Sequence, residues 1–203
     1  MFAVVDVETT GGHASGHCMT EIAIVIHDGL KVVDQYSTLL NPGRAIPIGI
    51  QSLTGISPEM VEKAPFFGQV AQEVHDFLGS HIFVAHNVNF DYAFVKAALA
   101  DCGIDYKPRR LCSVRFARRI EKGLRSYSLS NLCKHFNVSN EAAHRAWGDA
   151  SATAQILGYL LEKDTGAQWQ QLIKMNSGEF NLPAHLSSQD YHSLPEVPGV
   201  YYF

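Results

Sequence analysis

Three runs of apolar and β-branched residues near the start of the chain predict β-strands. They cover residues 2–8, 20–27 and 31–40. The second and third runs are separated by Asp28-Gly29, a dipeptide typical of short hairpins. Side chains of a strand alternate between its two faces, so Asp6 and Glu8 of the first run should lie on the same face as Phe2 and Val4.

The rest of the chain alternates helical and strand patterns. Helical spacing of apolar side chains predicts helices at residues 70–78, 90–99, 129–136 and 149–161. Short apolar runs predict buried strands at residues 82–85 and 111–114, and four prolines in residues 41–65 favour a long loop with one helical turn. A hairpin followed by alternating helices and strands predicts an α/β fold with a mixed sheet flanked by helices.

The pattern changes after the last long predicted helix. We expect one domain in residues 1–165, then a short helix and a polar linker in residues 166–192, and an apolar, aromatic segment in residues 193–203. No internal repeat and no low-complexity segment interrupts the chain.

Composition excludes several classes of protein. With 203 residues, 46% hydrophobic and 18% charged, the chain can bury a core without disulfides. No apolar run approaches the roughly 18 residues of a membrane span, so no membrane partner is expected. The amino terminus lacks the pattern of a secretory signal, and the four cysteines form no C-x-x-C pair. We therefore expect reduced thiols and a cytoplasmic location.

Basic residues are concentrated in residues 107–125. This segment holds eight of the sixteen basic residues and one acid, so it carries +7 while the rest of the chain carries −11. The segment either contacts the phosphate backbone of a nucleic acid or is an ordinary solvent-exposed helix face.

Carboxylates occur at the ends of predicted strands and the starts of predicted helices. Asp6 and Glu8 end the first strand, Asp91 begins a helix after the strand at 82–85, and Asp149 opens the last long helix, five residues after His144. Taken alone, each of these carboxylates has an ordinary structural role, in a turn, at a solvent-exposed strand end or as a helix cap.

Four carboxylates that converge on one site repel each other unless divalent cations neutralise them. Oxygen ligands suit Mg²⁺ or Mn²⁺ rather than zinc. Two such ions can hold a phosphodiester and activate a water molecule, and a nearby imidazole can accept the proton of that water at neutral pH.

The motifs Asp-Val-Glu-Thr-Thr-Gly, His-Asn-Val-Asn-Phe-Asp and His-Arg-Ala-Trp-Gly-Asp-Ala resemble those of the DEDD exonuclease superfamily over about residues 1–163. Histidine in the third motif marks the DEDDh subfamily, typified by the proofreading subunit of bacterial replicative DNA polymerase. The resemblance implies a ribonuclease-H-like fold and 3′→5′ exonuclease activity. It assigns two divalent cations to Asp6, Glu8, Asp91 and Asp149, and the role of general base to His144.

The same resemblance implies substrate contacts around the catalytic residues. It places seven residues near the terminal nucleotide: Thr9, Thr10, Leu53, Thr54, Ile56, Asn87 and Phe90. Packing within loops is the alternative for each of them.

The last ten residues, Leu-Pro-Glu-Val-Pro-Gly-Val-Tyr-Tyr-Phe, resemble the start of a GIY-YIG nuclease domain. If the full protein joins two nucleases, this indicates DNA repair or processing more than replication proofreading alone, with a DNA polymerase or repair proteins as expected partners. The sequence thus predicts an exonuclease acting on DNA 3′ ends. An RNA 3′ exonuclease and a non-catalytic nucleic-acid-binding module are the alternatives.

Overall fold

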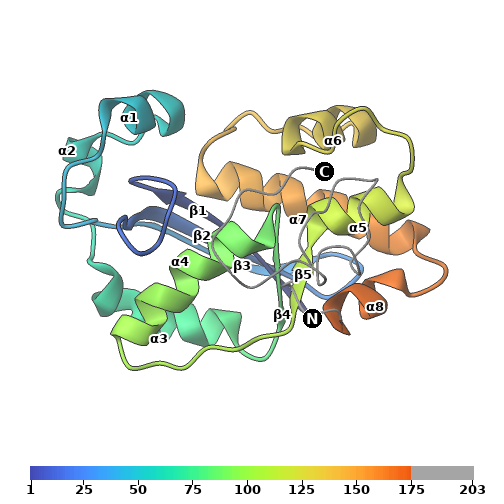
Figure 1. The fold of residues 1–203 in the computed structure, drawn as a ribbon, viewed down its shortest axis with the longest axis horizontal. Coiled ribbons are helices and arrows are strands. Elements are labelled where there is room, and N and C mark those ends of the chain that lie inside the picture. Colours follow the sequence, from blue (N-terminus) through green and yellow to red (C-terminus); the bar gives the residue numbers. More distant parts are fainter. Residues whose placement is uncertain (175–203) are drawn as a thin grey trace, which may run out of the picture.

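A five-stranded mixed sheet forms the centre of the computed structural model, which describes residues 1–174 (Figure 1). The strand order is β3-β2-β1-β4-β5. The strands are β1 (Phe2–Thr9), β2 (Met19–His27), β3 (Val32–Leu39), β4 (Ile82–Ala85) and β5 (Arg110–Cys112). β2 runs antiparallel to its two neighbours, β1 and β3, and β4 and β5 run parallel to β1. The predicted α/β class with a mixed sheet is confirmed.

Helices cover both faces of this sheet. They are α1 (Ile48–Thr54), α2 (Pro58–Val61), α3 (Phe67–Leu78), α4 (Val88–Asp101), α5 (Ser113–Ile120), α6 (Leu129–Phe136), α7 (Ala146–Lys163) and α8 (Gln168–Lys174). One apolar core joins a face of the sheet to α3 and α4, and the other joins the opposite face to α5, α6, α7 and α8.

The alternation in β1 sends successive side chains into different cores. Phe2 and Val4 pack with α7, while Ala3 and Val5 pack with α3 and α4. All nine residues of β2 are buried, as expected for a strand between two neighbours and under helices on both faces.

Two predicted elements differ from the structure. Residues 41–65 contain two helices rather than one turn in a loop, because their prolines lie where a helix accepts them. Pro47 precedes α1, Pro58 is the first residue of α2, and Gly55 ends α1 in a left-handed conformation. The predicted strand at 111–114 ends at Cys112, because Ser113 already begins α5.

The last long helix begins earlier than predicted. Arg145 has an extended conformation and precedes α7, so Asp149 lies within the first turn of the helix and does not open it. Further along, α8 packs on the core through Leu172 and Trp169, which extends the packed domain beyond residue 165. The predicted linker up to residue 192 lies mostly outside the described residues, and the GIY-YIG-like segment 193–203 entirely so. Within residues 1–174, no helix is long and apolar enough to cross a membrane.

Candidate active site

Three carboxylates meet where β1 ends beside the first turn of α7. Asp6 and Glu8 point from β1 toward the α7 side of the sheet, and Asp149 comes from the helix itself. One oxygen from each side chain lies within 4.8 Å of the others. The structure therefore brings these three predicted residues together.

The fourth predicted ligand, Asp91, approaches from α4 on the other side of β1. It lies in the first turn of α4 and is only 4% exposed. Its Oδ1 accepts a hydrogen bond of 3.2 Å from the backbone N–H of Val7, the residue between Asp6 and Glu8. Asp91 is thus tied to the same stretch of β1, although its oxygens are not part of the tight group of three.

Burial and mutual repulsion oppose ionisation of this group. Burial is the main cause that raises the pKa of Asp6 well above its usual range, and the charges of Asp91, Asp149 and Glu8 add to it. Burial raises the pKa of Glu8 to about 8, and that of Asp91 to about 7 despite the hydrogen bond from Val7. The charge of Arg145 acts in the opposite direction and lowers the pKa of Glu8.

These residues fit a hard divalent cation. Every donor in the group is a carboxylate oxygen, which matches the preference of Mg²⁺ and Mn²⁺. A cation between the carboxylates removes the repulsion that raises their pKa values.

His144 lies in the turn that precedes α7. Its side chain is exposed, and its backbone has a left-handed conformation with φ of 62°, which is uncommon for a residue with a Cβ. Its N–H donates to Asp149 Oδ2 over 3.3 Å, and Asn140 Nδ2 donates to Asp149 Oδ1 over 2.7 Å. Asp149 therefore holds both ends of the turn that carries His144.

Sequence reasoning missed Glu21, a buried acid in β2. It is the register partner of Glu8 on β1 and is 5% exposed. Arg145 binds it through two hydrogen bonds. The signal was present in the sequence, because Glu21 is the only charged residue among the apolar side chains of residues 19–26.

Two of the predicted substrate contacts lie at the end of β1. Thr9 and Thr10 are 6% and 2% exposed. The Thr9 hydroxyl donates to the Gly11 carbonyl, and the Thr10 hydroxyl accepts from the N–H of Cys18. Both hydroxyls therefore hold the β1–β2 loop in shape beside the carboxylates.

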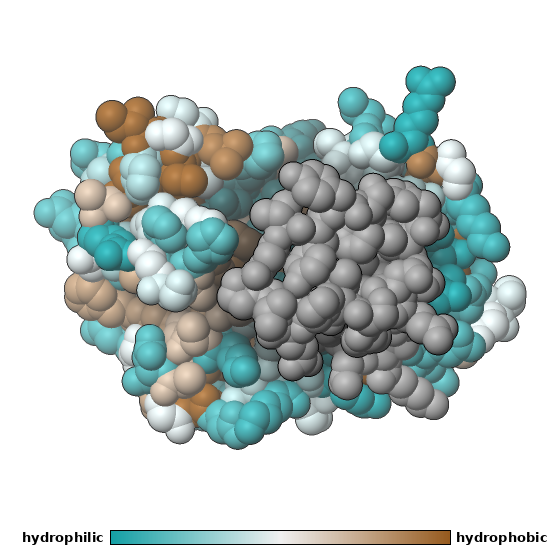
Figure 2. All heavy atoms as spheres, viewed as in Figure 1, coloured by the Kyte–Doolittle hydropathy of each residue, from teal (hydrophilic) through white to brown (hydrophobic). Residues whose placement is uncertain are grey.

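The predicted contacts on α1 and after it differ in exposure. Leu53 is 53% exposed, whereas Thr54 is buried and donates to the Ile50 carbonyl. Ile56 is fully buried in a small apolar cluster with Ile46 and Val61, where packing accounts for it. Apolar side chains gather over α1 in Figure 2, and Leu53 is among the exposed ones.

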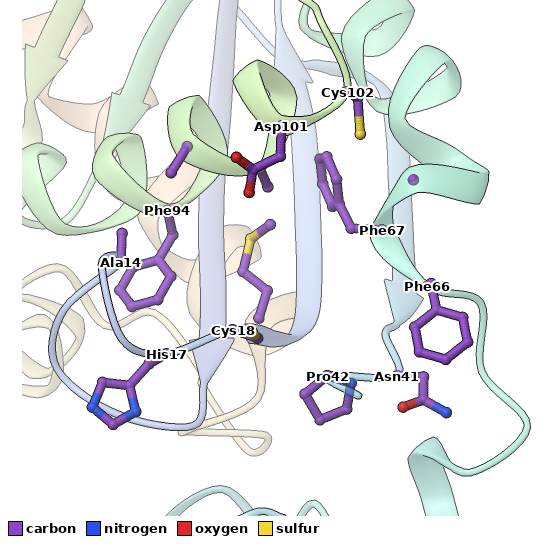
Figure 3. Close-up of a pocket in the computed structure, with 14 residues that line it drawn as sticks. Ala14, His17, Cys18, Asn41, Pro42, Phe66, Phe67, Phe94, Asp101 and Cys102 are labelled. Atoms are coloured by element: carbon purple, nitrogen blue, oxygen red, sulfur yellow. The ribbon is translucent and has the colours of Figure 1, made fainter. Parts of the chain in front are cut away.

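Asn87 and Phe90 flank Asp91 at the start of α4. Asn87 is exposed and has a left-handed φ of 104° just before the helix. Phe90 is half-buried and its ring lies 5.1 Å from that of Phe94. Phe94 in turn lines a separate, mostly apolar pocket of about 270 Å³ with Phe66 and Phe67, which holds none of the predicted site residues (Figure 3).

Known proteins resemble this chain in sequence and in fold. The family model described as exonuclease, RNase T, matches residues 3–157. The 3′-5′ exonuclease DinG of Staphylococcus aureus is 38% identical over 163 residues, which is 80% of this chain and 18% of that protein. The chain therefore spans about a fifth of the length of the curated relatives it matches.

Solved structures share the same fold. Exonuclease X in complex with 5′ overhanging duplex DNA is 27% identical, with a TM-score of 0.70 over 86% of this chain and 98% of that one. The nuclease domain of 3′hExo, a DEDDh family member bound to rAMP, has a TM-score of 0.66 at 19% identity, over 79% of this chain and 91% of that one. The family match covers most of the chain, so this protein belongs to the RNase T family of exonucleases.

Proposed function

We propose that this domain removes nucleotides from DNA 3′ ends by divalent-metal-dependent hydrolysis. The group formed by Asp6, Glu8 and Asp149 carries this proposal, because three mutually repelling carboxylates at the carboxyl end of the central strand have no structural use without cations. The repulsion among these carboxylates also argues against a non-catalytic binding module, which would not need them.

Two divalent cations, Mg²⁺ or Mn²⁺, would be held by Asp6, Glu8, Asp91 and Asp149. When bound, they neutralise the phosphodiester and favour the ionised form of a water molecule. In our proposal His144 accepts the proton of the attacking water. Its exposed side chain is accessible to solvent, and histidine is the side chain that most often serves as a general base in enzymes.

The substrate contacts that we propose lie on both sides of the carboxylates. Leu53 offers an exposed apolar side chain for the terminal base, and Phe90 a half-buried ring. Thr9 and Thr10, whose hydroxyls shape the β1–β2 loop, would contact the sugar, and Asn87 at the start of α4 would contact the phosphate. Stacking on such side chains tolerates any base, as an exonuclease requires.

DNA is the proposed substrate because Exonuclease X, similar to this chain in sequence and fold, was solved with duplex DNA. The four cysteines are free, which supports the cytoplasm as its location. A role in DNA repair or proofreading, with a polymerase or repair proteins as partners, is the part of the proposal that rests on the sequence resemblance alone.

The test is a time course on matched 5′-labelled DNA and RNA oligonucleotides, with Mg²⁺ and with a chelator. We expect a ladder of DNA products shortened from the 3′ end, with Mg²⁺ only, and a loss of roughly 10²–10⁴-fold for His144→Ala. Faster shortening of RNA would make RNA the substrate. Binding of DNA without hydrolysis in Mg²⁺ or Mn²⁺ would indicate a binding module.

A further inference from the structure

Glu21 lies next to carboxylates that should repel it. It is opposite Glu8 in the register of β1 and β2, is 5% exposed, and its charge raises the pKa values of Asp6 and Glu8. A buried acid that adds to this repulsion needs its own compensation.

The start of α7 supplies that compensation through three N–H groups. Arg145 Nη2 donates to Glu21 Oε1 over 2.6 Å and Arg145 Nε donates to Oε2 over 3.0 Å. The backbone N–H of Ala146 donates to the same Oε2 over 2.9 Å. A guanidinium that binds a carboxylate through two parallel bonds fixes both distance and angle.

This ion pair holds the residue that directly follows His144. His144 has a left-handed backbone, a conformation that persists only where its surroundings enforce it. Its own N–H is bound by Asp149, and the next side chain is bound by Glu21. The turn is thereby attached to α7 on one side and to β2 on the other.

We infer that Arg145, held by Glu21, is a positioning residue that sets the place of the His144 imidazole relative to the carboxylates. The inference rests on the proposed role of His144 as general base. Arg145 acts through the position of the preceding residue, His144, and a displacement of about 1 Å at a reacting group can cost on the order of 10²-fold in rate.

Two other roles for Arg145 give different results in solution. If the ion pair only stabilises the start of α7, its loss lowers the melting temperature and leaves kcat of the folded protein unchanged. If Arg145 acts on Glu8 through its charge, its loss changes the Mg²⁺ concentration that gives half-maximal activity.

The experiment is a double-mutant cycle with Arg145→Ala, His144→Ala and the double variant. Initial rates are measured at saturating DNA against Mg²⁺ concentration, with circular dichroism to confirm folding. Arg145→Lys keeps the charge but has one donor nitrogen in place of two, and Glu21→Gln keeps an acceptor for the N–H of Ala146. Either variant replaces Arg145→Ala in the cycle if Arg145→Ala does not fold. Lys31→Ala removes a cation beyond the far end of β2 and is the matched control.

We expect Arg145→Ala to lower kcat by about 10- to 100-fold, with KM and half-maximal Mg²⁺ within twofold of wild type. Arg145→Lys and Glu21→Gln should give smaller losses in the same direction. In the His144→Ala background, Arg145→Ala should cost less than threefold more, because the group that it positions is gone.

Three results would overturn the inference. The first is an unchanged kcat in folded Arg145→Ala, and the second is a change in the Mg²⁺ concentration that gives half-maximal activity of this variant. The third is a double variant whose loss in kcat equals the product of the losses in the two single variants. If instead His144→Ala keeps wild-type activity, the role of His144 as general base fails first, and the inference falls with it.

Discussion

The first turn of α7 leaves no room for a side chain at Gly148. A Cβ at this position would lie 2.2 Å from the carbonyl oxygen of Ala142, in the turn that carries His144, and 2.8 Å from the carbonyl carbon. Both distances are far below any ordinary contact. In Gly148→Ala the turn and the helix must therefore separate by about 1 Å, since carbon atoms pack best at about 3.5–4 Å.

Such a shift moves His144 relative to the carboxylates. We expect Gly148→Ala to lower kcat by on the order of 10²-fold, which equals about 2.7 kcal/mol of activation free energy. The assay is the initial rate of nucleotide release from saturating DNA with Mg²⁺, alongside the melting temperature of each variant.

Gly158→Ala is the matched control on the same helix. A Cβ there meets only the end of the His27 side chain, at 3.3 Å, so it requires a shift of a few tenths of an ångström and should keep near-wild-type kcat. A folded Gly148→Ala protein with kcat within twofold of wild type would refute the reasoning. Equal losses in both variants would attribute the effect to the helix and not to the turn.

Three further predictions concern the carboxylates and the basic segment. Asp6→Ala and Asp149→Ala should each leave no measurable Mg²⁺-dependent nucleotide release, and near-wild-type rates in either would contradict the site. The free energy of unfolding of the metal-free protein should fall as pH rises from about 5 to 8. The reason is that Glu8 ionises near its ordinary pKa of 4.5 in the unfolded chain but near 8 in the folded one. Thermal unfolding with and without Mg²⁺ measures this dependence, and Mg²⁺ should raise the melting temperature most near pH 8. A melting temperature that rises with pH in the metal-free protein would contradict the prediction. Arg118 and Arg119 are both exposed on α5, and reversing their charges should weaken binding to DNA of any sequence. Fluorescence anisotropy titrations should also show a weaker dependence of the binding constant on salt concentration. An unchanged salt dependence would favour a solvated helix face.

Local pattern was enough to predict much of the site. The alternation in β1 placed Asp6 and Glu8 on one face, and the motif around Asp149 placed that residue at a helix start. These features depend on residues close together in the chain, for which periodicity is a direct signal. That these two segments meet was implied by the family resemblance.

Contacts between distant segments were not predictable in the same way. The bond from Val7 to Asp91 spans 84 residues, and that from Arg145 to Glu21 spans 124. A single sequence carries no signal for such pairs, because each depends on the register of the sheet and the approach of a helix. The helices in residues 41–65 were missed because proline was taken to indicate a loop, although it also starts helices.

The contact between α8 and β1 determines where this domain can be cut for expression. The ring of Trp169 meets that of Phe2 at 5.2 Å edge to face, and Leu172 is 6% exposed. A recombinant fragment that stops at residue 165 would uncover Phe2, four positions before Asp6. Truncated versions intended for crystallisation or assay should therefore retain the chain through Lys174.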